Sequence, residues 1–274
     1  GVALDIRCQD FRSVTRRPQA VLAGLFCQFL LLPAIAWGCI LLLRPHPSIA
    51  LGLMLVSACP GGNVSNFLTA MSGGHAALSV SMSGLSTLAS IVMTPLNFMF
   101  WAGLSPPTQV LLKALPLSPA DILLTVLVIL VIPTALGIGL AGRYPSVAQR
   151  LKRPMRMASM LMLAGFIVLG LVGNWSAFVE HIGVAFWIVA TVNALGLGIG
   201  YWLARQVRLS EAESRAVAFE TGIQNSGYGL VVCFNHFAGL GGMAMIAAWW
   251  GVWHLISGLT LASLWRRYGT ADGT

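Results

Sequence analysis

Glu220-Thr221-Gly222-Ile223-Gln224-Asn225-Ser226-Gly227 is a polar stretch inside an otherwise apolar segment, residues 216–234. It combines a carboxylate, an amide pair, a hydroxyl and two glycines. An acidic residue at the centre of a bilayer costs about +3 kcal/mol on insertion scales, so it is retained where it has an interaction partner and a function. The stretch therefore predicts a polar site inside a broken membrane helix.

A second polar stretch, Cys59-Pro60-Gly61-Gly62-Asn63-Val64-Ser65-Asn66, interrupts another apolar run in the same manner. Two broken membrane segments, one in each half of a chain, are typical of secondary transporters, in which the binding site lies between them. We therefore expect a secondary transporter with its site where the two breaks meet.

The composition agrees with a membrane protein. Charged residues make up 9% of the chain, where a soluble domain has roughly 25%. Hydrophobic residues make up 57%, and the mean hydropathy is +0.82. The five cysteines are scattered and have no paired spacing, so neither a disulfide framework nor a cysteine metal site is expected.

Eight apolar runs are long enough to cross a hydrocarbon core, which takes about 20 residues. They are residues 20–43, 49–72, 76–103, 119–141, 157–173, 183–204, 212–236 and 240–265. With residues 1–18 in the cytoplasm, only Arg44 and Lys113 of the 16 Lys and Arg residues would face the outside. This division follows the positive-inside rule and predicts a cytoplasmic C-terminus. Because no single face collects the bases, we expect no nucleic acid partner despite the net charge of +8.

The breaks fall in the second and seventh of these eight runs, five apart. A repeating unit of five helices, an odd number, gives successive units opposite topology, which is the inverted-repeat plan of many transporters. Gln28 and Asn193 occupy similar mid-helix positions before the two breaks, and Ser65-Asn66 echoes Asn225-Ser226.

On this plan the chain is all-α and holds eight of ten helices. The chain starts at Gly1 without a methionine, so we expect the first two helices to be missing. The predicted organisation is a cytoplasmic segment (1–18), the rest of the first repeat (19–104), an external loop (105–118), the second repeat (119–267) and a cytoplasmic tail (268–274).

Broken helices supply both kinds of binding group that a coupled transporter needs. Backbone carbonyls that lose their i+4 donors are good ligands for a cation, and oxygen-rich surroundings favour a hard ion such as sodium. The half-helices that restart after each break direct free amides and a positive dipole end at an anion. Glu220 is the only acid well inside a predicted span, so it is a sodium ligand, a proton carrier or a neutral structural acid.

His254, in VWHLISG, lies mid-span and either reaches a substrate cavity or is a core histidine. The sequence contains no nucleophile elbow, HExxH, phosphate loop or dinucleotide fingerprint. We therefore do not expect an enzyme.

With these residues in view, the chain resembles a bacterial member of the bile acid:sodium symporter family. The resemblance covers nearly the whole chain and is most specific in four motifs: CPGGNVSNFLT (59–69), ALSVSMSGLSTLASIVMTP (77–95), FETGIQNSGYG (219–229) and VWHLISG (252–258). It implies ten helices in two inverted five-helix repeats, divided into a panel and a core domain, with two broken core helices crossing near two sodium sites.

The resemblance also implies site residues. The first sodium site would be formed by Ser65, Asn66, Ser79, Ser83 and Glu220, and the second by Gln28, Glu220, Gln224 and the backbone carbonyls of Thr221 and Ile223. The substrate would lie near Asn63, Asn225 and His254. Ser79 and Ser83 are four residues apart, so both hydroxyls lie on one helix face. Serine stands at 83 where threonine was expected, which keeps the oxygen and loses a methyl group.

The resulting hypothesis is sodium-coupled import of an organic anion, such as a bile acid, pantoate or another small carboxylate, by alternating access. Two sodium ions would be coupled to transport of the anion. The protein would lie in the lipid bilayer of a bacterial inner membrane, and no obligate protein partner is evident. The alternatives are a proton-coupled carrier, an exporter like the related arsenite carriers, and a membrane sensor that does not transport.

Overall fold

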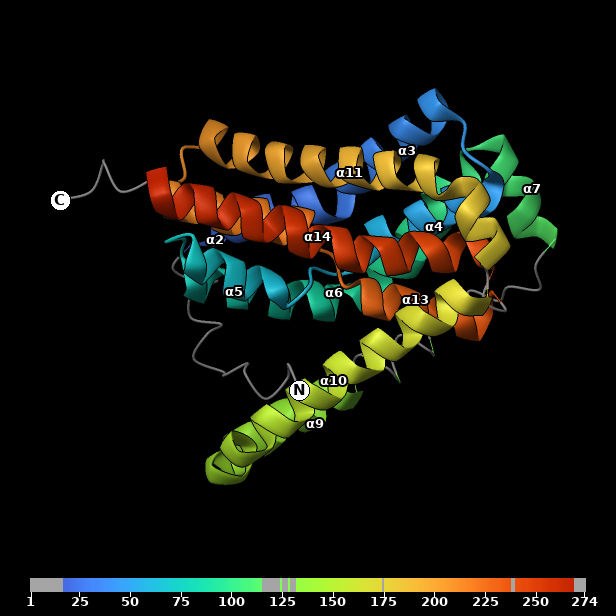
Figure 1. The fold of residues 1–274 in the computed structure, drawn as a ribbon. Coiled ribbons are helices and arrows are strands. Elements are labelled where there is room, and N and C mark those ends of the chain that lie inside the picture. Colours follow the sequence, from blue (N-terminus) through green and yellow to red (C-terminus); the bar gives the residue numbers. More distant parts are fainter. Residues whose placement is uncertain are drawn as a thin grey trace.

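The computed structural model describes residues 17–114, 124, 128, 132–173, 175–237 and 240–268. These residues are almost entirely helical (Figure 1). The one β-type pairing among them is an isolated antiparallel bridge between Gly61 and Gln224. The all-α prediction is confirmed. Residues 1–16, most of 119–131 and the tail after Tyr268 lie outside the described residues, and with them the start of the predicted helix 119–141.

The N-terminal half contains one rod, one broken helix and two further helices. The rod, Pro18–Leu43, has a π-helical turn in its middle. In order along the chain these elements are α2 (Pro18–Phe26), η2 (Cys27–Leu31), α3 (Leu32–Leu43), α4 (Pro47–Ala58), α5 (Val64–Met71), α6 (Ala76–Gly103) and α7 (Pro106–Ala114).

The first broken helix, predicted over 49–72, consists of α4 and α5. The α4 helix begins with Pro47, whose fixed φ suits a first turn, and the His46 side chain accepts a hydrogen bond from the Ser48 amide. The α4 helix ends before Pro60, because proline lacks the N–H that would continue the helical hydrogen bonds and restricts the conformation of the residue before it. The α7 helix lies inside the stretch predicted as the external loop 105–118, so that connection is partly helical.

The C-terminal half contains the second broken helix and three long helices. Its described elements are α9 (Ile132–Arg143), α10 (Pro145–Gly173), α11 (Trp175–Gln206), α12 (Glu211–Gly222), α13 (Ser226–His236) and α14 (Gly241–Tyr268). The second break, predicted over 212–236, separates α12 from α13. A capping box between Ser210 and Glu213 fixes the start of α12, because each satisfies a backbone amide of the other.

Four described helices are long and apolar enough to cross a membrane: Pro18–Leu43, Ala76–Gly103, Ile182–Gln206 and Gly241–Arg267. The α4 helix is apolar but shorter, as expected for half of a broken span. The α10 helix starts well before the apolar run 157–173 and includes the charged residues Arg150, Lys152 and Arg153. The count of eight crossings remains a prediction.

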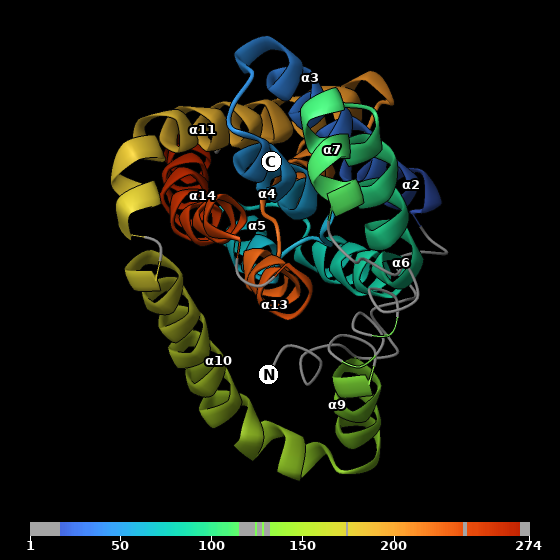
Figure 2. The same ribbon diagram turned by 90° about the vertical axis from the view of Figure 1, so that its right-hand side faces the viewer.

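The helices form a bundle with one separate arm. Figure 2 shows α9 and α10 diverging from the bundle that α2–α7 and α11–α14 make. In the bundle α4 is central: all of its residues except Pro47 are buried, and it packs against α3, α6 and α14. A helix buried on every face needs apolar residues all round, which the sequence of α4 provides.

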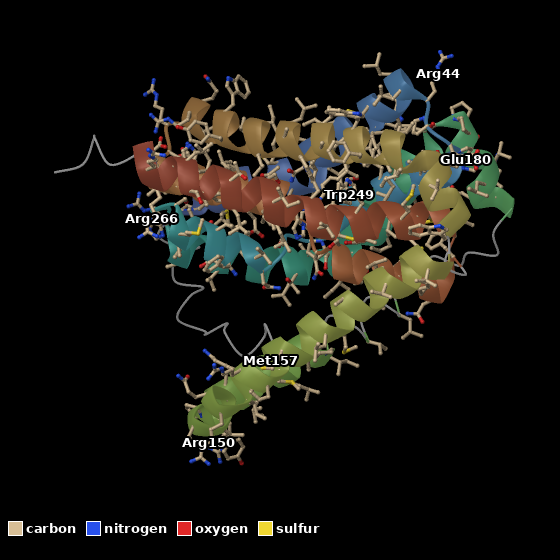
Figure 3. The ribbon with its side chains drawn as sticks, in the orientation of Figure 1. Arg44, Arg150, Met157, Glu180, Trp249 and Arg266 are labelled. Atoms are coloured by element: carbon tan, nitrogen blue, oxygen red, sulfur yellow. The ribbon has the colours of Figure 1, made fainter. Side chains whose placement is uncertain are left out.

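Labelled charged residues lie at both ends of the bundle. Arg44 and Glu180 lie at one end, whereas Arg266 lies at the other, and Arg150 on the arm lies toward the same end as Arg266 (Figure 3). The sequence placed Arg44 outside and both Arg150 and Arg266 inside. The structure is therefore compatible with the predicted division of the bases.

Candidate functional site

The two breaks meet at the centre of the bundle. The Gly62 amide donates to the Ile223 carbonyl at 2.6 Å, and the Asn225 amide donates to the Pro60 carbonyl at 3.0 Å, on either side of the Gly61–Gln224 bridge. Backbone at membrane depth is tolerated outside a helix only where its polar groups find partners. Here each unwound segment partly satisfies the other, so the two breaks form one crossing.

Glu220 lies beside this crossing and is 1% exposed. Its Oε2 accepts hydrogen bonds from Ser65 Oγ at 2.9 Å and Ser83 Oγ at 2.8 Å, and its Oε1 accepts one from Ser86 Oγ at 3.1 Å. No ion pair to Glu220 occurs among the described residues. A carboxylate surrounded by hydroxyl oxygens in this way is a strong attractor for a hard cation.

The remaining residues predicted for the first sodium site surround the same carboxylate. Asn66 Oδ1 accepts from Ser79 Oγ at 2.8 Å and lies 3.1 Å from Ser83 Oγ. Thr69 Oγ1 lies 3.3 Å from Ser79 Oγ. Thus α5, α6 and α12 bring all five predicted residues together, while their role as sodium ligands stays a prediction.

The residues predicted for the second site form a separate cluster at the crossing. Gln28 and Gln224 exchange hydrogen bonds of 2.7 and 3.0 Å between their side-chain amides. Gln28 Nε2 also donates to the Cys59 carbonyl, and Gln224 Nε2 donates to the Thr221 carbonyl, both at 2.7 Å. The Ile223 carbonyl takes part in the backbone crossing. Gln28, Gln224 and Thr221 therefore meet, whereas the hydrogen bonds of Glu220 within the described chain go to the serines of the first site.

The three residues predicted to contact substrate are not joined by any hydrogen bond in the described part of the chain. Asn63 and Asn225 precede the restarting half-helices α5 and α13, are half-buried, and lie on the two crossing segments. Asn225 Oδ1 accepts from the Tyr228 amide at 3.1 Å and so caps α13. His254 on α14 is buried, and its Nδ1 has no hydrogen-bond partner among the described residues.

One turn further along α14, Gly258 places this helix beside both breaks. A Cβ at Gly258 would contact Leu68 of α5 at 2.5 Å and Ile223 at 3.1 Å. His254 thus lies on a helix that packs directly on the crossing. A buried histidine with an unpartnered ring nitrogen is available to a polar ligand.

Gly61 is at the crossing because a side chain does not fit there. A Cβ at this position would overlap the carboxylate of Glu220. The absence of a side chain lets the first break lie directly against the acid on α12. Close approach to Glu220 therefore accounts for Gly61 in CPGGN, in addition to the effect of glycine in ending a helix.

Sequence reasoning missed one polar residue of the site, Ser86, which binds Glu220. It also missed two hydroxyls that hold neighbouring polar groups: Thr94 Oγ1 donates to the Ala58 carbonyl at 2.8 Å, and Ser257 Oγ donates to Asn193 Oδ1 at 2.6 Å. Ser86 had a usable signal, since it lies seven residues after Ser79 and three after Ser83 on one helix face. Thr94 and Ser257 resemble the many other hydroxyls in these spans and carry no distinguishing pattern.

The donor set suits sodium better than a transition metal. It consists of hydroxyl, amide, carbonyl and carboxylate oxygens, which are hard ligands. No group of three or more His, Cys, Asp or Glu side chains gathers within the described ranges. The free Cys27, Cys59 and Cys233 are buried individually and contribute no paired thiolates.

A cavity of about 500 Å³ lies away from the crossing, at the end of the bundle that carries Arg266. It is lined by Ala70, Met71, Ser72, Gly73, Arg215, Trp265 and Arg266. Arg215 is already bound there by the Ser72 carbonyl and Glu211, and its guanidinium lies over Trp265. The cavity contains none of the predicted site residues.

The family model of the Sodium Bile acid symporter family matches residues 1–181 of the chain. The chain belongs to this family. The match confirms the resemblance on which the site predictions were based, and it includes the first break with its Ser65, Asn66, Ser79 and Ser83.

Related proteins extend the similarity over the second break. The chain is 29% identical over 267 residues to the "Uncharacterized sodium-dependent transporter YocS" of Bacillus subtilis (strain 168), covering 97% of this chain and 80% of that protein. It is 30% identical over 270 residues to the "Probable sodium/metabolite cotransporter BASS2, chloroplastic" of Oryza sativa subsp. japonica, covering 98% and 62%. It is 29% identical over 227 residues to the human "Ileal sodium/bile acid cotransporter", covering 82% and 63%.

The chain therefore spans less than two thirds of the length of the rice and human proteins. As a member of the Sodium Bile acid symporter family with membrane-spanning helices, it is a multi-pass membrane protein of a sodium-dependent transporter family. Membership also places it with transporters and not with enzymes at the family level.

Proposed function

We propose that this protein is a sodium-coupled symporter that imports a small organic anion by alternating access. The observation that carries the proposal is the convergence of Ser65, Ser83 and Ser86 on the buried carboxylate of Glu220, beside two crossing helix breaks. An intramembrane acid without a basic partner needs either a proton or a bound cation. The oxygen atoms around it favour the cation.

The first sodium ion would bind between α5, α6 and α12. Its ligands would be Glu220, Asn66 and the hydroxyls of Ser65, Ser79 and Ser83. Each hydroxyl oxygen has lone pairs free to face a cation while its hydrogen turns to a neighbouring oxygen. The ion would thus tie both broken helices to α6.

The second ion would bind at the cluster of Gln28 and Gln224. Gln28 and Gln224 would present their amide oxygens, together with the carbonyls of Thr221 and Ile223, and Glu220 would supply the nearby negative charge. Because the amide pair now bonds to itself and to the Thr221 carbonyl, both side chains would have to turn when the ion binds. Such a turn would make the second site sensitive to the geometry of the crossing.

The anion would bind where the half-helices α5 and α13 begin. Asn63 and Asn225 stand at these N-termini, where the positive dipole ends and the amides not used by local hydrogen bonds favour a carboxylate. His254 would add a polar contact from α14. With both ions bound, the two unwound segments would be held in the geometry that presents these amides, which makes anion binding depend on sodium.

Alternating access would follow from motion between two parts of the molecule. The bundle would serve as the core that carries the ions, and the α9–α10 arm would belong to the panel against which it moves. The bases at the Arg266 end support a cytoplasmic C-terminus in a bacterial inner membrane. Substrates would be bile acids, pantoate or similar carboxylates.

The experiment that tests the proposal is the melting temperature of the purified protein in sodium and in potassium at equal ionic strength, with Glu220→Gln beside it. A ligand that binds only the folded state raises the melting temperature with its concentration. We expect a sodium-specific rise in the native protein and none in Glu220→Gln, because the shared ligand charge is lost. Equal melting temperatures in the two cations would contradict the proposal.

Proton coupling is the second candidate, favoured by the burial of Glu220. It predicts that stability and anion uptake follow pH and are unchanged when choline replaces sodium at fixed pH. Uptake that persists in choline would replace the sodium proposal with the proton one. An exporter of the arsenite-carrier type would instead release its anion from right-side-out vesicles.

A further inference from the structure

The ends of the two broken helices are held by side chains in matching ways. The last carbonyls of a helix have no intrahelical donor, and inside a membrane water cannot supply one. At the end of α4, Gln28 Nε2 donates to the Cys59 carbonyl at 2.7 Å. At the end of α12, Asn193 Nδ2 donates to the Gly222 carbonyl at 2.8 Å.

The two contacts occupy equivalent positions about the crossing. The bridge pairs Gly61 with Gln224, and each capped carbonyl belongs to the residue two places earlier. Each donor comes from the rod or helix that precedes the broken helix, η2 in one half and α11 in the other. This correspondence supports the inverted repeats predicted from the sequence.

The helices that follow the breaks add a second matching pair. Thr94 on α6 donates to the Ala58 carbonyl, and Ser257 on α14 donates to Asn193 Oδ1 at 2.6 Å. The halves differ in one respect. Thr94 binds its broken helix directly, whereas Ser257 acts through Asn193.

Asn193 is fully buried, and both edges of its amide are engaged. Its nitrogen holds the Gly222 carbonyl, and its oxygen is held by Ser257. Gly222 lies between Thr221 and Ile223, the residues whose carbonyls were assigned to the second sodium site. Fixing the Gly222 peptide on the α11 side constrains the directions in which the two neighbouring carbonyls can point.

Ser257 connects this arrangement to α14. Its Oγ also lies 3.4 Å from the carbonyl of His254, so both residues share one helical turn. A continuous path of contacts therefore runs from the turn that carries His254, through Ser257 and Asn193, to the end of α12. Residues that orient ligands in this way affect metal affinity without touching the ion.

We propose that Asn193 is a positioning residue for the second sodium site and that Ser257 links it to the anion-binding turn of α14. This inference deepens the proposed function and rests on it. Asn193 itself is not proposed as a ligand, because it acts through the Gly222 carbonyl that it holds. A ligand contacting His254 shifts this turn, and the shift reaches the carbonyls of Thr221 and Ile223 through Ser257.

The test is a sodium titration of melting temperature in the full chain, comparing Asn193→Leu with the native protein. Leucine has a similar size and brings no charge into the membrane, but it leaves the Gly222 carbonyl without its donor. We expect the half-saturating sodium concentration to rise about tenfold, the lower range for losing such an orienting contact. An unchanged value would overturn the inference.

The matched control is Thr94→Val, which removes a side-chain hydrogen bond to a carbonyl at the end of the other broken helix with little change in shape. In potassium, the melting temperatures of both variants should lie below that of the native protein by a similar amount, since each variant leaves one buried carbonyl without a donor. Only Asn193→Leu should weaken sodium binding. An equal rise in the half-saturating sodium concentration in both variants would show that Asn193 has only a structural role, and it would overturn the proposal.

Ser257→Ala tests the link to α14 and remains informative if Asn193→Leu does not fold, because every backbone carbonyl keeps its donor. With taurocholate as the probe, the native protein should bind sodium more tightly at saturating taurocholate, as linkage between sites requires. In Ser257→Ala this tightening should fall by at least half. Full tightening in the variant would overturn the link. A native protein without any sodium-specific stabilisation would instead overturn the proposed function, so the two failures are distinguishable.

Discussion

At the scale of single residues, the site consists of one acid and the hydroxyls around it. The carboxylate of Glu220 uses both oxygens: Ser65 and Ser83 bind one, and Ser86 binds the other. Ser86 Oγ also lies 3.2 Å from the Ser83 carbonyl. Three hydroxyls on two elements hold the acid in one orientation.

We expect Ser86→Ala to weaken sodium binding without abolishing it. The hydroxyl fixes Oε1 of Glu220, and its loss should raise the half-saturating sodium concentration roughly three- to tenfold, as the net contribution of one typical hydrogen bond, about 0.5–1.5 kcal/mol, allows. A sodium titration of melting temperature measures this. Ser90→Ala is the matched control, because Ser90 is buried one turn further on α6 and bonds to the Thr87 carbonyl instead. Similar titration curves for the two variants would contradict the role of Ser86.

At the scale of elements, the π-helical turn η2 and the two breaks give the site its shape. Wide turns inside α-helices are frequent at functional sites. This one, Cys27–Leu31, contains Gln28 and is followed by α3 with Pro33 at its second position. From it the Gln28 side chain reaches the end of α4 and the side chain of Gln224 at once.

The pairing of Gln28 with Gln224 leads to a prediction about cooperativity. We expect Gln28→Ala and Gln224→Ala each to disable the second site and leave the first intact, so the Hill coefficient for sodium should fall from above 1 toward about 1. Sodium-dependent uptake of a labelled anion in proteoliposomes provides the measurement. Gln19→Ala removes an exposed glutamine contact to the Val207 carbonyl and should leave the coefficient unchanged. A native Hill coefficient in both site variants would argue against two sodium sites.

At the scale of the whole molecule, the bundle keeps its charges at its ends and its polar site at its centre. Exposed apolar side chains such as Leu42, Leu96 and Val172 cover the outside of the helices, as a lipid environment requires. At the Arg266 end, Arg215 joins α12 to the end of α5 and lies over Trp265. The two broken helices are therefore connected to each other at both the crossing and this end.

The charge balance of the cycle is a property of the whole molecule. Two sodium ions and one monoanion would carry one net positive charge inward per cycle. An inside-negative potential of about 100 mV favours each entering positive charge by about 2.3 kcal/mol, so it should accelerate uptake into proteoliposomes. The measurement is initial uptake with a potassium diffusion potential of either sign. Uptake that is insensitive to the potential would contradict this stoichiometry and indicate one sodium per anion.

Local sequence determined much of this protein. Long apolar runs fixed the helical membrane fold, because backbone groups in lipid must be satisfied within a helix. Pro60 with Gly61-Gly62, and the polar stretch from Glu220 to Gly227, located both breaks to within a few residues. The four-residue spacing of Ser79 and Ser83 placed their hydroxyls on one face. The family resemblance then identified residues that the structure brings together around Glu220.

The tertiary structure alone decided which polar groups meet across long separations. Ser65 and Glu220 are 155 residues apart in sequence, and Gln28 and Gln224 are 196 apart. Helical periodicity specifies a face but not the neighbour that the face meets, since that depends on how α5, α6, α12 and η2 pack. For this reason Thr94 and Ser257 were missed, and Asn193 appeared only as an echo of Gln28. Their roles arise from carbonyls exposed by a break in a different helix.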